Sequence, residues 1–483
     1  MAESAVAARL LDSLQLAERP RPRAVARWPH AHWLAVGTVC LGAFLGQLTA
    51  SVTSLVFPAL EGHFAAPFAA VEWVSLAYLL VLVALLAPVG RLSDLVGRKT
   101  VYLGGFVVFA AASLGAGLAG NLGVLIGCRA VQAVGGAMMQ ANSVALVARG
   151  VPERAMRTAL GVQAAAQALG LALGPTLGGL LVAHASWRWA FWVNVPIGVL
   201  GLLAGWFLLP RTFPDGRRPA RPERHPERRT EQREGRFDLA GLLLLGGSST
   251  ALLLALSAAS GLPLPGWAVA VLSAAAAAGT LGLVRQERRA DRPIIPPGLV
   301  NTPGIRAGLL VALIGYLLLF CPLVLEPVVL VGGGAGATAA GAAITALPAA
   351  FALAATAGGA LLPRRWSDAA RCRCGALTAA AGLLALALLP APGPWTTAAP
   401  LLLTGYGLGL LLPANNALVM RAIPAQSSAV GGGLVNMVRS LGTAFGTALP
   451  VLAVHQAGPA AGGRAVPLLL AAVALLAARL CRD

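Results

Sequence analysis

The chain has 483 residues, of which 57% are hydrophobic and only 11% are charged, and its mean hydropathy is +0.77. This composition excludes an ordinary soluble globular protein and is typical of a helical membrane protein. The net charge of +18 does not indicate nucleic-acid binding, because the arginines are spread over short connections between apolar segments instead of gathering on one folded face.

Fourteen apolar segments predict transmembrane helices. A helix needs roughly 20 mainly apolar residues to cross a hydrocarbon core of ~30 Å with its backbone hydrogen bonds satisfied internally. In chain order, the predicted spans cover residues 33–60, 71–89, 100–119, 122–148, 158–183, 190–209, 239–260, 267–284, 307–331, 338–362, 374–389, 396–420, 430–454 and 465–480.

The basic residues lie on one side of these spans. All but four of the 36 lysines and arginines fall in the N-terminal tail, at the C-terminus or in connections that follow even-numbered spans. The opposite connections hold only Arg188 and Arg464, while Arg129 and Arg439 lie inside spans. Because cytoplasmic loops carry the excess of basic residues, we expect both termini in the cytoplasm of a cell whose inner or plasma membrane holds the protein.

Two echoes indicate an internal repeat. The pattern R-x-S-D-x-x-x-x-[KR] occurs at residues 91–99 and again at 365–373, and Leu-Gly-x-x-x-Gly occurs at 169–174 and 441–446. Spans one to six therefore correspond to spans nine to fourteen, and spans seven and eight form an inserted pair. The sequence predicts an all-α polytopic membrane protein with two six-helix bundles plus two inserted helices.

The expected parts of the chain follow from these spans and from the charged connections between them. They are a cytoplasmic N-terminal tail (1–32), an N-terminal six-helix bundle (33–209), a basic linker (210–237), the inserted pair (238–284), a cytoplasmic loop (285–306), a C-terminal six-helix bundle (307–480) and a cytoplasmic C-terminus (481–483).

Three motifs lie in order along the first half of the chain. The stretch Gly90-Arg91-Leu-Ser-Asp94-Leu-Val-Gly97-Arg98-Lys99 resembles motif A of the major facilitator superfamily. Arg129-Ala-Val-Gln132-Ala-Val-Gly-Gly136 resembles motif B, and Gly170-Leu-Ala-Leu-Gly174-Pro175-Thr-Leu-Gly178-Gly179 resembles motif C, which marks exporters in that superfamily. With fourteen spans, and with Asp238 and Gly241 opening the seventh, the chain is similar throughout to the fourteen-helix drug:proton antiporters.

The resemblance implies a transporter and not an enzyme. It implies export of a small lipophilic or cationic compound, such as a drug or antibiotic, in exchange for protons by alternating access, and hence multidrug efflux or antibiotic resistance. The energy source would be the proton-motive force without a cofactor or metal, and the partners would be the bilayer, the substrate and protons, with the protein acting as a monomer. Alternatives are a facilitator that imports a nutrient, or a polytopic membrane enzyme or sensor; a metal site, a nucleophile motif and a P-loop are all missing from the sequence.

Motifs A and C suggest gates. Asp94 and the basic residues Arg91, Arg98 and Lys99 can meet charged groups or helix ends, and Gly90 and Gly97 would permit the tight turn between two spans. For Arg98 and Lys99, the competing interpretation is that they are present only because cytoplasmic loops are rich in basic residues. We expect the glycine face of motif C to pack against the partner bundle and seal the outer end, with ordinary helix packing as the alternative.

One residue departs from the family pattern. Thr49 stands where the first span of these antiporters usually carries an aspartate, and a threonine hydroxyl does not titrate near neutral pH. Glu326 is the one carboxyl group inside an otherwise uncharged predicted span, so we expect it to carry the proton; a solvated structural role is the alternative. Glu61 and Glu72 are weaker candidates because we expect water around them.

Polar side chains inside the predicted spans are candidates for the lining of a central cavity. Arg129 and Arg439 are costly at such depth unless they are paired or face water, although Arg129 could also extend to the nearby headgroups. For the uncharged residues, helix packing and cavity lining are equally compatible with the sequence. The candidates are Gln47, Tyr78, Gln140, Gln163, Tyr316, Asn416, Asn436 and Arg439.

The arginine distribution makes a topological prediction. In a variant without the natural cysteines, a cysteine at Gly333 should react with a membrane-impermeant maleimide added to intact cells, because the connection after the ninth span is expected outside. A cysteine at Gly216 should react only after the cells are opened. Labelling of position 216 in intact cells would show that the arginines do not report the topology.

Overall fold

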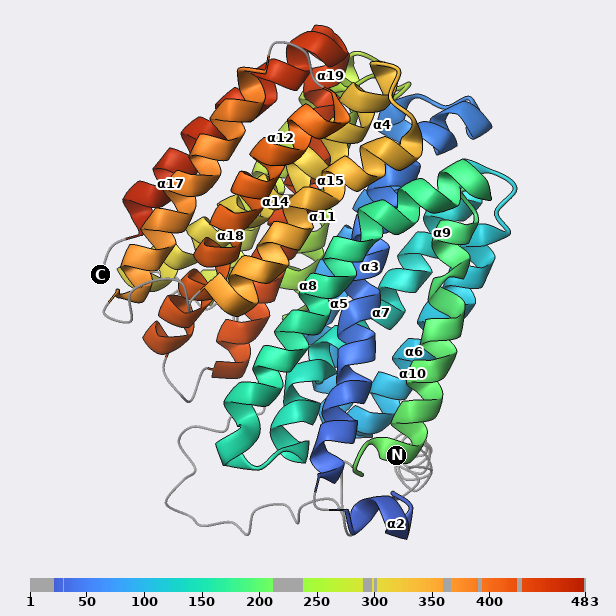
Figure 1. The fold of residues 1–483 in the computed structure, drawn as a ribbon, viewed down its shortest axis with the longest axis vertical. Coiled ribbons are helices and arrows are strands. Elements are labelled where there is room, and N and C mark those ends of the chain that lie inside the picture. Colours follow the sequence, from blue (N-terminus) through green and yellow to red (C-terminus); the bar gives the residue numbers. More distant parts are fainter. Residues whose placement is uncertain are drawn as a thin grey trace.

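The computed structural model describes residues 21–28, 30–211, 238–289, 298, 302–358, 366–389, 393–423 and 428–481. Most of the predicted tail and C-terminus, the 210–237 linker and much of the 285–306 loop therefore lie outside the described residues. The described part folds into long helices that run side by side (Figure 1), and thirteen of them are long and apolar enough to cross a membrane. The helix in the predicted seventh span contributes only a shorter apolar stretch, Leu243–Ala259, so the count of fourteen depends on this helix.

Each long helix of the first half covers a predicted apolar segment, and the ends agree to within five residues, except that the second long helix extends to Val96, seven residues beyond its predicted end. Two single-turn helices, α4 (Phe68–Val71) and α9 (Trp189–Trp192), lead into α5 and α10. The long helices are α3 (Ala31–Phe64), α5 (Trp73–Val96), α6 (Arg98–Gly117), α7 (Leu122–Gly150), α8 (Glu153–His184) and α10 (Asn194–Leu208), and a short helix α2 (Arg23–Ala26) precedes them.

The second half follows the same plan after the inserted pair. One continuous element, α19, contains two predicted spans, which Gly458 separates with a φ of 78° that favours glycine. The elements are α11 (Leu239–Ala259), α12 (Trp267–Arg289), α14 (Pro303–Gly332), α15 (Ala337–Leu353) with a π-helical turn η2 (Ala354–Gly358), α17 (Asp368–Ala387), α18 (Pro394–Ala422) and α19 (Ser428–Leu480).

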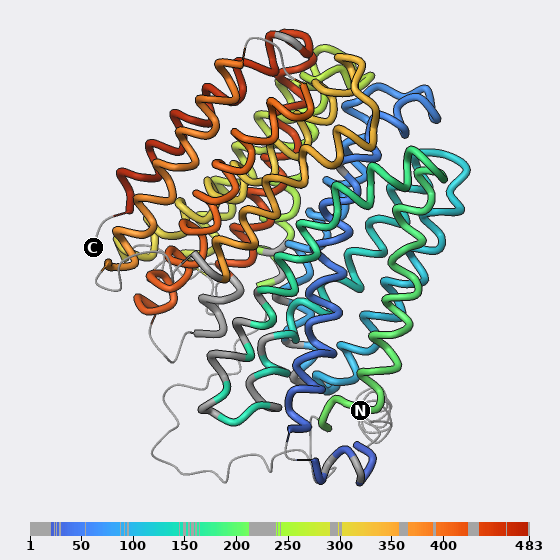
Figure 2. Tube along the Cα trace, viewed as in Figure 1, coloured from blue at the N-terminus to red at the C-terminus, as the bar shows by residue number. Residues whose placement is uncertain are grey.

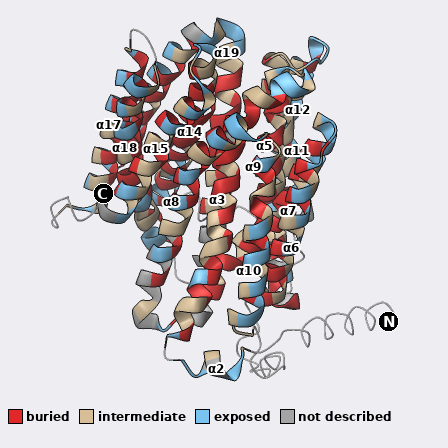
Figure 3. Cartoon of the chain, turned by 45° about the vertical axis from the view of Figure 1, so that its right-hand side comes forward, coloured by how far each residue is buried: buried red, intermediate tan, exposed pale blue. Residues whose placement is uncertain are grey.

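Helix pairing repeats between the two halves of the chain. In the first half α3 packs on α8 and α6 on α7, and in the second half α14 packs on α19 and α17 on α18. Figure 2 shows the blue-to-green and orange-to-red segments as two neighbouring groups of helices, and Figure 3 shows buried residues along their inner faces. The fold is that of an all-α polytopic membrane protein built from related halves.

We call the end at which α2 lies, and at which α5, α7 and α10 finish, the arginine-rich end; the other is the opposite end. The halves meet where α8 packs on α15 and where α5 packs on α19. The hydroxyls of Thr176 and Thr345 lie 2.6 Å apart across the α8–α15 contact. A Cβ atom at Gly179 would lie 2.8 Å from the carbonyl oxygen of Ala337, so the two backbones approach closely toward the opposite end.

The glycine face of motif C corrects one expectation. Gly170, Gly174 and Gly178 face α3 of their own half, where a Cβ atom at Gly174 would lie 2.9 Å from the amide nitrogen of Val52. Gly179, the hydroxyl of Thr176 and the carbonyl oxygen of Pro175 beside Gly341 face the partner half. Glycines spaced by four share one helix face, but that spacing does not reveal which neighbour the face contacts. Contact with the partner half therefore comes from residues near the end of the motif and not from its main glycine face.

The inserted pair is attached to both halves through α11. Asp238 begins this helix by accepting hydrogen bonds from the amide of Gly241 (2.8 Å) and from Gln286 of α12 (2.8 Å). Near its other end, the carbonyl oxygen of Ala259 accepts a hydrogen bond from Gln456 of α19 (3.1 Å). Because α11 also packs on α5, it bridges the two halves beside their contact.

Close packing of α8 on α3 predicts a size limit at position 174. Gly174→Leu should destabilise the protein by several kcal/mol, because overpacking at a backbone contact forces the two helices apart. The measurement is thermal unfolding of purified protein. Gly37→Leu is the matched control, since Gly37 lies on α3 with no atom within 4 Å of an added Cβ. Equal unfolding temperatures for the two variants would show that α3 and α8 do not touch at Gly174.

Candidate functional site

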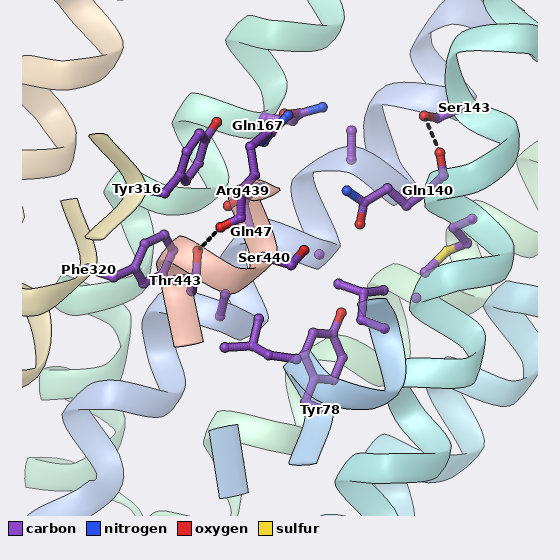
Figure 4. Close-up of a pocket in the computed structure, with 18 residues that line it drawn as sticks. Gln47, Tyr78, Gln140, Ser143, Gln167, Tyr316, Phe320, Arg439, Ser440 and Thr443 are labelled. Carbon is purple, nitrogen blue, oxygen red and sulfur yellow. Dashed lines mark hydrogen bonds between the residues drawn. The ribbon is translucent and has the colours of Figure 1, made fainter. Parts of the chain in front are cut away.

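A cavity lies between the two halves of the chain. Four helices of the first half and two of the second supply its walls, and polar side chains from both halves point into it (Figure 4). The lining residues are Gly42, Ala43, Gly46, Gln47, Ala50, Tyr78, Leu79, Leu82, Gly136, Met139, Gln140, Ser143, Gln167, Tyr316, Phe320, Arg439, Ser440 and Thr443.

The structure brings most of the predicted lining residues together. Gln47, Tyr78, Gln140, Tyr316 and Arg439 line this cavity. The other three candidates do not belong to its wall. Gln163 is buried within the helices, Asn416 is partly buried on α18, and Asn436 accepts a hydrogen bond from Nη1 of Arg439 (3.3 Å).

Several lining residues were not singled out by their sequence. Phe320, Thr443 and Ser143 each follow a predicted lining residue by three or four positions, which places them on the same helix face. This spacing was the feature of the sequence that could have identified them as lining residues. Met139 and Ser440 also line the cavity.

Arg129 of motif B is fully enclosed. Its Nε donates to the carbonyl oxygen of Val74 (2.8 Å), its Nη1 donates to Oε1 of Gln132, and the amide of Gln132 donates to Ser113 (2.6 Å). The guanidinium also lies 4.5 Å from the centre of the Tyr78 ring. These contacts tie α5, α6 and α7 together. Arg129 is 1% exposed, so it does not extend to the headgroups, and the neighbouring Gly136 leaves room for the Tyr78 hydroxyl.

Arg439 has a different environment. It is partly buried and lines the cavity, where its guanidinium lies 4.7 Å from the centre of the Tyr316 ring. Its hydrogen bond to Asn436 leaves further N–H groups free to meet a ligand. Of the two arginines within predicted spans, only Arg439 presents its charge to the cavity.

Motif A holds two helix ends together. Gly97 joins α5 to α6 with a φ of 115°, as the predicted turn requires, whereas Gly90 lies inside α5 and not in the turn. Lys99 is buried, and its ammonium donates to the carbonyl oxygens of Leu209 (2.8 Å) and Trp206 (3.1 Å) at the end of α10. This cap supports the expected contact with helix C-terminal carbonyls over a purely topological role for Lys99.

The structure describes the remaining residues of motif A only in part. Ser93 accepts a hydrogen bond from the amide of Asn142 (2.7 Å), which links α5 to α7. Arg98 begins α6. The side chains of Arg91 and Asp94 lie outside the described residues, so the gating role of Asp94 stays a prediction.

Thr49, at the position of the missing first-span acid, forms a neutral pair with Asn194. The Thr49 hydroxyl donates to Oδ1 of Asn194 on α10 (2.9 Å), and both side chains are buried. Neither group titrates near neutral pH. The position at which the antiporters that the sequence resembles usually carry an acid therefore holds no titratable group in this chain.

Glu326 is buried in α14 between Pro322 and Pro327 and is only 2% exposed. Helical spacing places it on one face with Leu319 and Leu323, which belong to the apolar core of the second half. It does not belong to the described cavity wall. Burial argues against the solvated role that was its alternative.

Glu72 corrects a second expectation, because it is not in water. Its side chain is 0% exposed, and one carboxyl oxygen accepts a hydrogen bond from the hydroxyl of Ser257 on α11. The indole of Trp73 donates to the same hydroxyl (3.0 Å). The other carboxyl oxygen has no hydrogen-bond partner in the described structure. The sequence did not reveal this burial because the inserted helix that covers Glu72 is far away in the chain.

The two arginines predict different responses to the same substitution. Arg129→Met removes a second donor from the Val74 carbonyl and leaves the Gln132 amide oxygen buried without its donor, which should lower the stability by about 2 kcal/mol or more. Arg439→Met removes a single long hydrogen bond and should change the stability little. Thermal unfolding of both purified variants measures the difference. Equal losses would mean that Arg439 is also a structural residue.

Comparison with known proteins agrees with this geometry. The model of the Major Facilitator Superfamily matches residues 39–447. The riboflavin transporter RibZ of Clostridioides difficile is 27% identical over 86% of this chain and 87% of its own length. The tetracenomycin C resistance and export protein of Streptomyces glaucescens is 28% identical over 88% of this chain and 77% of its own.

A solved structure shares the fold. The human organic anion transporter MFSD10 (TETRAN) aligns with a TM-score of 0.59 at 16% identity, and the alignment covers 94% of this chain and all of that one. At this identity the likeness shows the fold alone. Paired helices, a cavity between two halves and a family match over most of the sequence lead to one conclusion: the chain is a membrane transporter and belongs to the Major Facilitator Superfamily.

Proposed function

We propose that this transporter exports small, largely apolar compounds from the cytoplasm in exchange for protons. The observation that carries the proposal is the central cavity, which both halves of the chain line at the place where they meet. A site shared by two halves can open to either side when the halves rock about it. Amide, hydroxyl and aromatic groups among apolar residues suit a compact organic ligand with a few hydrogen-bonding groups.

Export is supported by two further features. The chain contains a sequence that resembles motif C of the exporters, and it is similar over most of its length to a tetracenomycin C resistance and export protein. In the structure, the end of this motif contributes to the contact between α8 and α15. This contact must open in any cycle that releases substrate at the opposite end.

A second candidate function is the movement of a nutrient without antiport. The similarity of the chain to a riboflavin transporter supports this second function. The two functions differ in their response to a pH gradient. In proteoliposomes that are acid inside, an antiporter accumulates substrate as protons leave, whereas a uniporter only equilibrates it. Tetracenomycin C and riboflavin are suitable first substrates.

Proton exchange requires a carboxyl group that changes its protonation state during the cycle. An ionised carboxylate is costly to bury without a cation, whereas the protonated form is neutral, so the two forms respond differently when water enters. Glu326 is our first candidate because it is buried in α14, six residues beyond the cavity residue Phe320. Glu72 is the second, since it is buried at the junction of α5 and α11 with one oxygen unpaired.

Substitution by glutamine separates binding from coupling. Glu326→Gln should abolish substrate accumulation driven by the pH gradient, because glutamine cannot exchange a proton, yet substrate exchange without a gradient should persist. Both are measured in proteoliposomes with labelled substrate. Glu61→Gln is the control, because Glu61 is an exposed acid near the end of α3.

The outcome assigns the coupling group. Gradient-driven accumulation that survives in Glu326→Gln but is lost in Glu72→Gln would transfer the role to Glu72. Accumulation that survives in both variants would exclude these two carboxyl groups. A wild-type protein that shows no response to the gradient would contradict antiport itself.

A further inference from the structure

The central cavity has an unbalanced charge. Arg439 is the one charged side chain among the described residues of its wall, and none of those residues is acidic. Its described partners are the amide oxygen of Asn436 and the face of the Tyr316 ring, both uncharged. A guanidinium in such apolar surroundings is costly unless a counter-charge or water compensates it.

The chain offers no carboxylate close to Arg439 on the six helices that line the cavity. The sequences of α7 and α19 contain no acid at all, and the acids on or beside the other four are Glu61, Glu72, Asp94, Glu153 and Glu326. The first four lie at helix ends, and Glu326 lies ten residues, about 15 Å of helix, beyond Tyr316 on α14. A negatively charged ligand can therefore supply the charge that balances Arg439.

The surroundings of Arg439 also define the shape of that ligand. Tyr316 and Phe320 are one helical turn apart on α14, and Tyr78 faces the same cavity from α5 (Figure 4). Aromatic walls favour a flat ring system through stacking. A planar guanidinium with free N–H groups suits a carboxylate or an ionised phenol.

We propose that the cavity binds aromatic compounds that carry a negative charge, with the anion on Arg439 and the rings against Tyr316, Phe320 and Tyr78. This inference rests on the proposed transport function and narrows its substrate class. A cationic drug, one of the two types expected from the sequence, would meet repulsion from Arg439 and would find no carboxylate in the described wall.

The test uses three ligands with one ring system and different charges. Binding of 2-naphthoate, 2-naphthamide and 2-naphthylmethylammonium to the purified protein in nanodiscs is measured by calorimetry, with empty nanodiscs as the blank. The anion should bind tightest and roughly tenfold or more tighter than the cation, because a charged hydrogen bond is gained in one case and charge repulsion in the other.

Three variants identify the responsible group. Arg439→Gln should weaken naphthoate binding by about tenfold and leave naphthamide binding nearly unchanged, while Arg439→Lys should restore part of the difference. Arg464→Gln removes the same charge from an exposed position outside the cavity wall and should bind naphthoate as the unmodified protein does.

Two results would overturn the inference: equal or tighter binding of the cation to the unmodified protein, or naphthoate binding that is absent or insensitive to Arg439→Gln. The assay needs no pH gradient, so it is independent of antiport. Saturable naphthoate binding together with failure of gradient-driven transport would reject the proposed coupling and retain the anion site.

Discussion

An arginine buried in apolar surroundings must be compensated, and the different ways in which this protein compensates two arginines organise the rest of the structure. Arg129 is satisfied inside the first half by a carbonyl oxygen, an amide and an aromatic face, so it holds three helices in place. Arg439 is left with a long hydrogen bond and a ring, and it faces the cavity. One arginine stabilises the scaffold, and the other is free for a ligand.

Close backbone contacts divide the molecule into units that can move. Glycines of motif C bring α8 onto α3, and Gly442 and Gly446 bring α19 onto α14 in the same manner. Such small-residue contacts favour rigid helix pairs. The halves themselves meet where α8 packs on α15 and α5 on α19, with the Thr176–Thr345 hydrogen bond and the bridge that α11 makes to α19. Movement between the halves can therefore leave the pairs within each half intact.

The sequence predicted the positions of helices along the chain most accurately. Hydropathy placed the start of α7 at Leu122 and that of α11 at Leu239, because length and apolarity are imposed directly by the bilayer. It failed where the answer depended on a neighbour in space. The buried state of Glu72 and the partner of the motif C glycines require knowledge of which helix lies opposite, and periodicity within one helix cannot supply it. For the cavity, polar type identified five lining residues but could not separate them from Gln163 and Asn436.

In the proposed transport cycle, the halves must separate where α8 meets α15 for substrate to cross. The Thr176 and Thr345 hydroxyls lie close enough for cysteines at these positions to form a disulfide. In a variant without the natural cysteines, transport in proteoliposomes is measured after oxidation and again after reduction of the Thr176→Cys, Thr345→Cys pair. Oxidation should stop transport, and reduction should restore it. Undiminished transport by the fully cross-linked protein would show that substrate crosses without opening of the α8–α15 contact.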